Sequence, residues 1–406
     1  MSETPPEAQI PEQRHGGDYA PSVAERLAVY QRAGGIITPL LTTIFAFLMG
    51  GLVVLATGHN PISTYKGIFN GTGLNYLWAE DRGLAEFNLQ QTLLITTPLI
   101  FTGLAVAFAF RCGLFNIGGQ GQYIVGAMTA VWVGSVWGGL PGVPHAAIAI
   151  LLAALAGALW AGVAGLLKAT VGAHEVITTI MLNWIAYWVG SYAFGQGGPL
   201  QNKTNVSVPI SSDVVPNARL HVWWGNAQLQ GLHIGFFFAL FALVVYWFVL
   251  NRTTLGYEVR AVGYNPEAAR YGGISVARNY FVAMAIAGTF AGLGGAMDIL
   301  GWQFRLGVLD IQNSTIGFIG IAVALLGRNT AVGVGFSALL FGALLYGTST
   351  RSLDPAVFPP ELAGNLTLMI QALVLFFVGA DVLVIYVWNL RRKLRRATGR
   401  PAEAPT

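Results

Sequence analysis

The stretch HAAIAILLAALAGALWAGVAGLL, residues 145–167, has no Asp, Glu, Lys or Arg and decides the class of the fold. About 20 such residues, wound as an α-helix, cross the roughly 30 Å hydrocarbon core of a bilayer. Comparable apolar runs recur between Ile36 and Trp388. We therefore predict an all-α, polytopic membrane protein with about ten transmembrane helices. The predicted spans are residues 37–57, 92–110, 118–138, 145–167, 175–195, 232–250, 279–301, 314–327, 330–349 and 366–388.

The composition excludes the soluble classes of protein. Only 10% of the 406 residues are charged and 54% are hydrophobic, whereas a soluble domain is about 25% charged. The net charge of +4 does not indicate nucleic-acid binding, because the basic residues gather at the predicted membrane edges. Cys112 is the single cysteine and the six histidines lie far apart in the sequence, so we predict no metal and no cofactor bound by this chain.

The distribution of basic residues predicts the orientation. With the N-terminus inside, most of the 22 Lys and Arg residues lie in the tails and in the connections on the cytoplasmic side, as the positive-inside rule requires. Both termini are therefore predicted to be cytoplasmic. The expected organisation is a disordered tail over residues 1–34, a transmembrane domain over 35–390 whose largest cytoplasmic connection is 251–278, and a basic tail over 391–406.

Two external connections, residues 59–91 and 196–231, are long and contain tryptophan. Tryptophan favours the membrane–water interface, so we expect interfacial anchoring or short helices there; docking of an external partner is the alternative. The span 314–327 is the shortest, at about 14 residues, so a half-spanning or re-entrant segment is the alternative to a complete crossing.

Glycine patterns suggest two further features. Glycine-broken segments near residues 113–121 and 288–295 are compatible with an inverted five-plus-five repeat, although the two halves do not align in sequence. The spacing Gly288-x3-Gly292-x3-Ala296 predicts close packing of helices.

The connection 251–278, NRTTLGYEVRAVGYNPEAARYGGISVAR, contains the signals of one short helix over residues 266–271. These signals are Asn265 as N-cap, Pro266 at the first helical position, Glu267 at the positive end of the dipole, and Gly272 or Gly273 as left-handed C′ residue. A helix of this length is marginal alone, so it is expected to pack against its own membrane helices or a cytoplasmic partner. An ordinary capped loop helix is the alternative.

The run EAARYGG, residues 267–273, resembles the EAA-x3-G cytoplasmic loop of binding-protein-dependent ABC importer permeases, in which a coupling helix inserts into a groove on the ATPase. Residues 113–128, 175–186 and 317–333 narrow the resemblance to the nucleoside permeases that work with basic-membrane-protein lipoproteins. One departure is Thr330, where that family usually has proline.

The resemblance implies a multi-pass permease of the bacterial inner membrane that serves an ATP-driven ABC importer and translocates nucleosides delivered by an external binding lipoprotein. The implied partners are an ABC ATPase subunit that binds ATP and Mg²⁺, a second homologous permease, the lipoprotein and the bilayer. The residues implied in ATPase coupling are Asn265, Pro266, Glu267, Ala268, Ala269, Arg270 and Gly273. The chain has no Gly-Lys dipeptide and hence no Walker A lysine, so it is predicted not to be an enzyme.

A second group of candidates lies within the membrane domain. Amides and aromatic rings suit a nucleoside, which has ribose hydroxyls and a planar base. The candidates for the substrate path are Phe115, Asn116, Gln120, Gln122 and Asn183, and Tyr123 would also suit this path. The alternatives are a tight turn of small residues at 113–122 and, for Asn183, a structural hydrogen bond between helices.

Two intramembrane acids, Asp298 and Asp381, are expected to be solvated or paired with arginine, because each lies nearer the end of a predicted helix than its midpoint. Two other functions remain open. A related ABC permease would carry ribose or another simple sugar. An ion-coupled secondary transporter would need well-buried acids and would work as one polypeptide.

Overall fold

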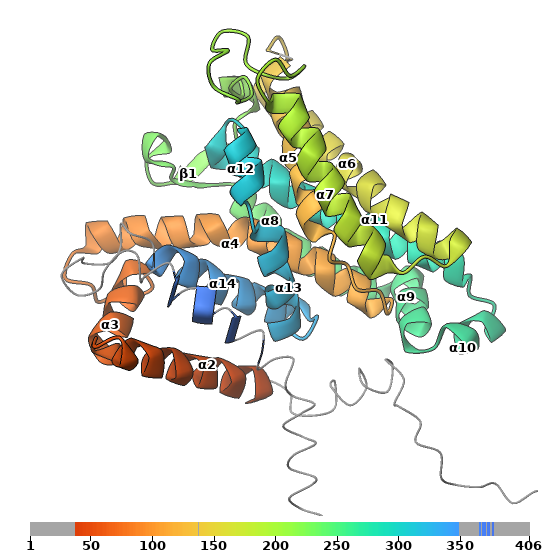
Figure 1. Ribbon diagram of the computed structural model, residues 1–406, viewed down its shortest axis with the longest axis horizontal. Coiled ribbons are helices and arrows are strands. Elements are labelled where there is room, and N and C mark those ends of the chain that lie inside the picture. The colour runs from red at the N-terminus through yellow and green to blue at the C-terminus, as the bar shows by residue number, and fades with distance from the viewer. Residues whose placement is uncertain are drawn as a thin grey trace, which may run out of the picture.

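The computed structural model describes residues 37–136, 138–348, 365, 366, 368–370, 372, 373 and 376 (Figure 1). The predicted tails at 1–34 and 391–406, most of the predicted span 366–388 and Asp381 lie outside the described residues.

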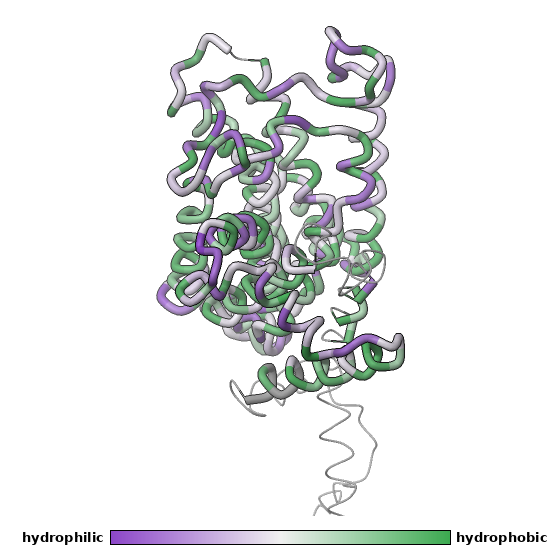
Figure 2. Tube along the Cα trace, turned by 90° about the vertical axis from the view of Figure 1, so that its left-hand side faces the viewer, coloured by the Kyte–Doolittle hydropathy of each residue, from purple (hydrophilic) through white to green (hydrophobic). Residues whose placement is uncertain are grey.

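Apolar helices form the body of the protein, and each of the first nine predicted spans overlaps one. These helices are α2 (Ile37–Ala56), α4 (Arg82–Arg111), α5 (Gly119–Val136), α6 (Gly142–Val171), α7 (Glu175–Phe194), α8 (Gly235–Arg252), α11 (Val276–Asp298), α13 (Ile316–Leu326) and α14 (Ala331–Gly347). Hydrophobic residues follow the helices and hydrophilic residues gather in the connections (Figure 2).

Five segments of the described chain are long and apolar enough to cross a membrane. They are α4, α6, α8, α11 with its π-helical end η3 (Ile299–Gln303), and residues 308–326. The predicted membrane architecture is therefore supported, while the number of about ten spans, the side of the termini and the inverted repeat stay predictions.

Helix α4 is the centre of the bundle, because 83% of its most apolar stretch is buried, compared with 33% for α6 and 28% for α8. It begins at Arg82 and not at residue 92 as predicted. The reason is that the Asp81 carboxylate accepts a hydrogen bond from the Leu84 N–H at 3.0 Å and caps the helix. The first turns of α4 are polar, so hydropathy alone placed them in the preceding connection.

Glycines bring α6 and α11 into close contact, as their spacing predicted. A Cβ atom on Gly288 would collide with the carbonyl oxygen of Gly157, and one on Gly292 with that of Ala153. Backbones at this separation exclude any larger side chain at the crossing.

The segment predicted as short, 314–327, is part of an interrupted helix. Helix α12 (Val308–Asn313) ends before Ser314, and α13 begins at Ile316 and is 11 residues long. Helix α13 alone is about 16 Å long, which is half of a hydrocarbon core. Together with α12, however, it forms the candidate span 308–326, so partial crossing by residues 314–327 stays a prediction.

The described chain is mostly helical, as the all-α prediction requires, and a small sheet, which was not predicted, lies in the connection 196–231 and at the start of the next predicted span. Residues 222–233 form a two-stranded antiparallel sheet, β1 (Val222–Trp224) and β2 (Leu232–His233), in which Val222 pairs with His233 and Trp224 with Leu232. Single turns of 3₁₀-helix, η1 (Pro216–Ala218) and η2 (Ala227–Leu229), flank β1. Such short strands carry too little periodicity to be detected in the sequence.

The connection 59–91 contains the helix α3 (Pro61–Gly71), which lies against α2. The Tyr65 hydroxyl donates a hydrogen bond to the Phe47 carbonyl at 2.6 Å, and the two rings pack edge to face at 5.6 Å. Burial raises the pKa of Tyr65 to about 12, so this hydroxyl keeps its proton and remains a donor at neutral pH.

Candidate functional site

The connection 251–278 folds into two short helices, α9 (Thr254–Tyr264) and α10 (Pro266–Tyr271). The bounds predicted for α10 are confirmed. The Asn265 side-chain oxygen accepts hydrogen bonds from the N–H groups of Glu267 and Ala268 at 3.0 and 3.1 Å, and Gly273 adopts φ +80° after the helix. Helix α9 was not foreseen, because its apolar positions are few and its start is fixed by the Thr253 cap.

Most of α10 is exposed. Ala269 alone is buried, whereas the Tyr271 side chain is 91% exposed. Glu267 and Arg270 form an ion pair at 3.3 Å, which contributes little to stability because both side chains are open to solvent. Helix α10 therefore presents an exposed surface at one end of the bundle (Figure 1).

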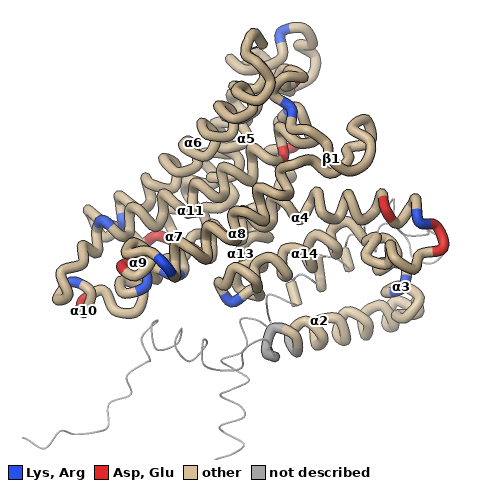
Figure 3. Tube along the Cα trace, turned by 180° about the vertical axis from the view of Figure 1, so that it is seen from behind, with Lys and Arg blue, Asp and Glu red and all other residues tan. Residues whose placement is uncertain are grey.

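Basic residues gather at the same end of the bundle. Helices α4, α6, α8 and α10 each carry a basic residue in their last turn, and Figure 3 shows Lys and Arg around α9 and α10. A cation at a helix C-terminus complements the helix dipole. The residues are Arg111, Lys168, Arg252 and Arg270.

Helix α9 connects α10 to the rest of the bundle through two contacts. The Asn279 amide of α11 donates to the Glu258 carboxylate at 3.0 Å. On another side, Gly263 approaches the turn between α4 and α5 so closely that a Cβ atom would collide with the Arg111 carbonyl oxygen. Gly113, at φ +75°, lies in this contact.

This α4–α5 turn contains the polar stretch singled out in the sequence. Asn116 and Gln122 form a reciprocal amide pair, with both N–H···O distances at 2.9 Å, and both side chains are buried. Phe115 is half-buried and packs on Phe110 with ring centroids 5.0 Å apart. The pair fixes the loop that precedes α5.

Gln120 spans the interruption between α12 and α13. Its amide nitrogen donates to the Ser314 carbonyl at 2.8 Å, and its amide oxygen accepts from the Gly317 N–H at 2.8 Å. The side chain thereby satisfies one acceptor and one donor that the break in the helix leaves free.

Asn183 joins α7 to the same turn. Its oxygen accepts from the Gly121 N–H at 2.8 Å, and its amide nitrogen donates to the Ile117 carbonyl at 2.9 Å. The structure thus brings four of the five candidate path residues together, and the amides of all four are paired within the protein. Contact with a substrate stays a prediction for these residues.

The expectation for Asp298 is wrong. Its side chain is 3% exposed, and its carboxylate accepts hydrogen bonds from the Tyr123 hydroxyl and, at 3.0 Å, from the Trp302 indole N–H. The hydrogen-bond partners of the Asp298 carboxylate are therefore two neutral donors. The sequence had led us to expect water or an arginine in their place. The Trp302 partner was missed because it lies beyond Asp298 in the π-helical end of α11, a local geometry that the sequence pattern does not reveal.

Side chains of α4 and α8 donate hydrogen bonds to the turn between α13 and α14. The Arg111 guanidinium donates to the Asn329 carbonyl at 2.6 and 3.1 Å, and the Tyr246 hydroxyl donates to the same oxygen at 2.8 Å. Thr330, at the position where the resemblance led us to expect proline, caps α14 by accepting a hydrogen bond from the Gly333 N–H at 3.1 Å. The departure from proline thus supplies a cap.

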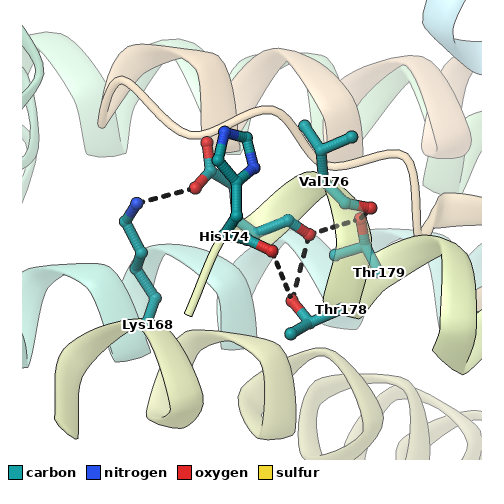
Figure 4. A network of polar contacts seen from close by, with 6 residues as sticks. Lys168, His174, Val176, Thr178 and Thr179 are labelled. Atoms are coloured by element: carbon teal, nitrogen blue, oxygen red, sulfur yellow. Dashed lines mark hydrogen bonds and ion pairs between the residues drawn. The ribbon is translucent and has the colours of Figure 1, made fainter. Parts of the chain in front are cut away.

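The turn between α6 and α7 lies at the same end of the bundle. Lys168 and Glu175 form an ion pair at 2.8 Å, and Thr179 donates to the Glu175 carbonyl at 2.7 Å (Figure 4). Sequence analysis missed this ion pair, because the two residues are separated by a helix end.

Within the described part of the chain, no three His, Cys, Asp or Glu side chains come together to hold a metal ion.

Comparisons with known proteins identify the family of this chain. The family described as branched-chain amino acid transport system, permease component, matches residues 88–379. The guanosine ABC transporter permease protein NupP of Bacillus subtilis is 36% identical over 371 residues, which cover 89% of this chain and 98% of that protein.

Two further relatives are similar over most of their length. The nucleoside ABC transporter permease protein NupB of Lactococcus lactis is 34% identical over 355 residues, 86% of this chain and 92% of that protein. The glucose ABC transporter permease protein TsgB13 of Haloferax volcanii is 34% identical over 352 residues, which cover 84% of this chain and 86% of that protein. No solved structure matches the chain. The chain therefore belongs to the family of branched-chain amino acid transport system permease components, and it is a multi-pass membrane transport subunit and not an enzyme.

Proposed function

We propose that this chain is the permease subunit of an ATP-driven importer for nucleosides. The observation that carries the proposal is the similarity, over almost the whole chain, to permeases named for guanosine and for nucleosides. The similarity to a glucose permease keeps a simple sugar such as ribose as the alternative substrate.

The proposed partners follow from the family and from the exposed end of the bundle. A separate ATPase subunit binds ATP and Mg²⁺ and receives α10 in a groove on its surface. A second homologous permease completes the membrane part of the complex. An external lipoprotein captures the nucleoside and delivers it to the side opposite α10.

Helix α10 is proposed to transmit the motion of the ATPase. Its support is the combination of a fixed start, the Asn265 cap, with an exposed surface that ends in Tyr271. A helix with one buried side chain gains little from its own packing, so a partner surface would supply the remaining contacts. Because Asn265 also ends α9, a displacement of α10 would act directly on α9.

From α9 the proposed route enters the membrane domain through the Gly263–Gly113 contact. Beyond that contact, the α4–α5 turn holds α7 through Asn183 and the α12–α13 interruption through Gln120. Each link is a direct contact or a hydrogen bond, so a rigid movement of α9 would change the positions of α7 and α13 together.

The substrate is tested by uptake of radiolabelled adenosine and uridine in cells with and without this gene. Unlabelled nucleosides, ribose and leucine serve as competitors. The proposal expects uptake to require the gene and to be inhibited by nucleosides alone. Inhibition by ribose would move the substrate to a sugar, and uptake that persists after deletion of the ATPase gene would favour an ion-coupled secondary transporter.

A further inference from the structure

The segment that joins α12 to α13 carries exposed polar side chains, although it lies within the candidate membrane span 308–326. Helix α12 ends at Asn313 and α13 begins at Ile316. The side chains of Gln312, Asn313 and Thr315 are all exposed. These three residues are called the polar break below.

Contacts with α4 place the polar break at the depth of the hydrocarbon core. The Thr102 hydroxyl oxygen lies 3.3 Å from the Ile316 carbonyl oxygen, and a Cβ atom on Gly320 would collide with the Thr102 side chain. Thr102 is separated from Arg111, the last residue of α4, by about 14 Å of helix, and from Arg82, the first, by about 30 Å. The polar break is therefore well inside the membrane domain and not at its surface.

The polar break offers hydrogen-bonding groups that the protein itself does not use. The Thr315 hydroxyl forms no cap on α13. The side chains of Gln312 and Asn313 have no hydrogen-bond partner within the described residues. Two amides and one hydroxyl supply donors as well as acceptors. Such groups are costly to leave unpaired in hydrocarbon, so this segment is unsuited to lipid.

Other candidate spans show the kind of surface that suits lipid in this protein. Helix α6 exposes Leu151, Leu155 and Leu159, and α8 exposes Phe241 and Val244. Every exposed side chain between residues 147 and 167 of α6, and between 237 and 244 of α8, is apolar. The polar break differs from both helices in chemistry and not in exposure.

A water-filled path on the exposed side of the polar break explains this difference. Irregular backbone at membrane depth is tolerated where it is buried in protein or lines a watery cavity. Gln120 covers the break from one side through its bonds to Ser314 and Gly317, and the polar break faces the other. A second permease packed on that side would have to pair all three polar side chains, whereas contacts between membrane helices mostly use small residues.

We propose that the polar break lines the translocation path and binds the ribose hydroxyls of the nucleoside. Each ribose hydroxyl both donates and accepts, and the amides of Gln312 and Asn313 and the hydroxyl of Thr315 do the same. Phe318 is 44% exposed and lies three residues after Thr315, so it is on the same face of α13. Its ring offers a surface for the base, since stacking on aromatic rings accepts every base. This inference rests on the proposed function.

The polar break is also joined to the coupling route. Gln120 belongs to the first turn of α5 and bonds to the backbone on both sides of the interruption. A movement that reaches the α4–α5 turn from α9 would therefore shift the polar break and change its grip on the ribose.

The first test removes the hydrogen-bonding groups with little change of volume. Asn313→Leu and Thr315→Val are expected to lower guanosine uptake at least about fivefold at normal membrane levels, because each loses a bond to the ribose. Thr315→Ser keeps the hydroxyl and should change uptake less than about twofold. Asn205→Leu, at an exposed site in the connection after α7, is the control and should leave uptake unchanged. Unchanged uptake by Asn313→Leu and Thr315→Val would overturn the ribose contact.

The second test is thiol labelling of the assembled importer in membrane vesicles with a polar, membrane-impermeant reagent. Cys112 is the only cysteine, so Cys112→Ala provides the background. Gln312→Cys and Asn313→Cys place thiols in the polar break, and Leu155→Cys on α6 is the lipid-facing control. The thiols of the polar break are expected to react at least about tenfold faster than the control, because a thiol in apolar surroundings stays protonated.

Guanosine and ribose are then added separately, and uptake of both by the unmodified importer is measured in parallel. Fast labelling that guanosine slows supports the proposal. Labelling at the rate of the control while guanosine is transported overturns the path along the polar break and leaves the proposed function intact. Fast labelling that transported guanosine does not change overturns the contact with the nucleoside. Uptake of ribose alone, with labelling that ribose slows, overturns the nucleoside substrate and retains a hydroxyl-binding role for the polar break.

Discussion

Replacement of Asn183 by leucine separates the two roles that an amide at this position can have. The side chain is 7% exposed, and it accepts from the Gly121 N–H and donates to the Ile117 carbonyl. Leucine has a similar volume, so the packing of α7 on α5 is largely retained. The substitution leaves one backbone donor and one backbone acceptor buried without their partner.

The expected loss of stability follows from these two bonds. A hydrogen bond between membrane helices contributes about 0.6 kcal/mol on average and up to about 1.7 kcal/mol. A buried group left unpaired costs about 1–3 kcal/mol, but the variant no longer buries the amide itself. We therefore expect Asn183→Leu to lower the free energy of unfolding by about 1–3 kcal/mol.

The assay is equilibrium unfolding of the purified chain in mixed micelles by titration with sodium dodecyl sulfate, followed by helical circular dichroism. Asn205→Leu is the matched control, because Asn205 is exposed in the connection after α7. This substitution should change the free energy of unfolding by less than about 0.5 kcal/mol. An unchanged free energy for Asn183→Leu combined with loss of nucleoside uptake would refute the structural role and indicate direct contact with the substrate.

Three further substitutions have definite expected outcomes. Gly292→Val should prevent folding and membrane accumulation because the side chain would meet the Ala153 carbonyl oxygen, whereas Gly139→Val, at a site with open space, should accumulate normally in an immunoblot of membranes. Gln120→Leu should lower the free energy of unfolding by about 1–3 kcal/mol in the same titration, since both backbone partners at the α12–α13 interruption lose their bond. Asn265→Ala should lower uptake several-fold at normal expression, because the lost cap costs α10 about 1 kcal/mol, or roughly a factor of five in the population of the ordered helix, and Asn265→Asp should retain uptake; equal uptake by both variants would contradict a need for an ordered α10.

Local signals allowed the sequence to predict α10 to the residue. Its N-cap, its proline and the glycines that follow act within one or two turns, so no knowledge of the fold was needed. The close packing at Gly288 and Gly292 was predictable for the same reason, because small residues at helical spacing are needed wherever backbones touch.

The features that were missed depend on tertiary contacts and on local backbone geometry that the sequence pattern does not reveal. The partners of Asp298 come from α5 and from the π-helical end of α11, and Lys168 and Glu175 meet only because a turn reverses the chain. Hydropathy also placed the start of α4 too late, since the polar first turns of a capped helix look like a loop. The amide cluster was found by its composition, but which backbone group each amide satisfies is decided by tertiary structure.

The most direct test of the central claim is nucleoside accumulation in proteoliposomes that contain this chain, its ATPase, its partner permease and the binding protein. The account predicts that radiolabelled guanosine or uridine accumulates only with hydrolysable ATP on the ATPase side, that a non-hydrolysable analogue stops it, and that ribose and leucine do not compete. Accumulation driven by an ion gradient without ATP, or uptake that ribose inhibits and nucleosides do not, would contradict the account.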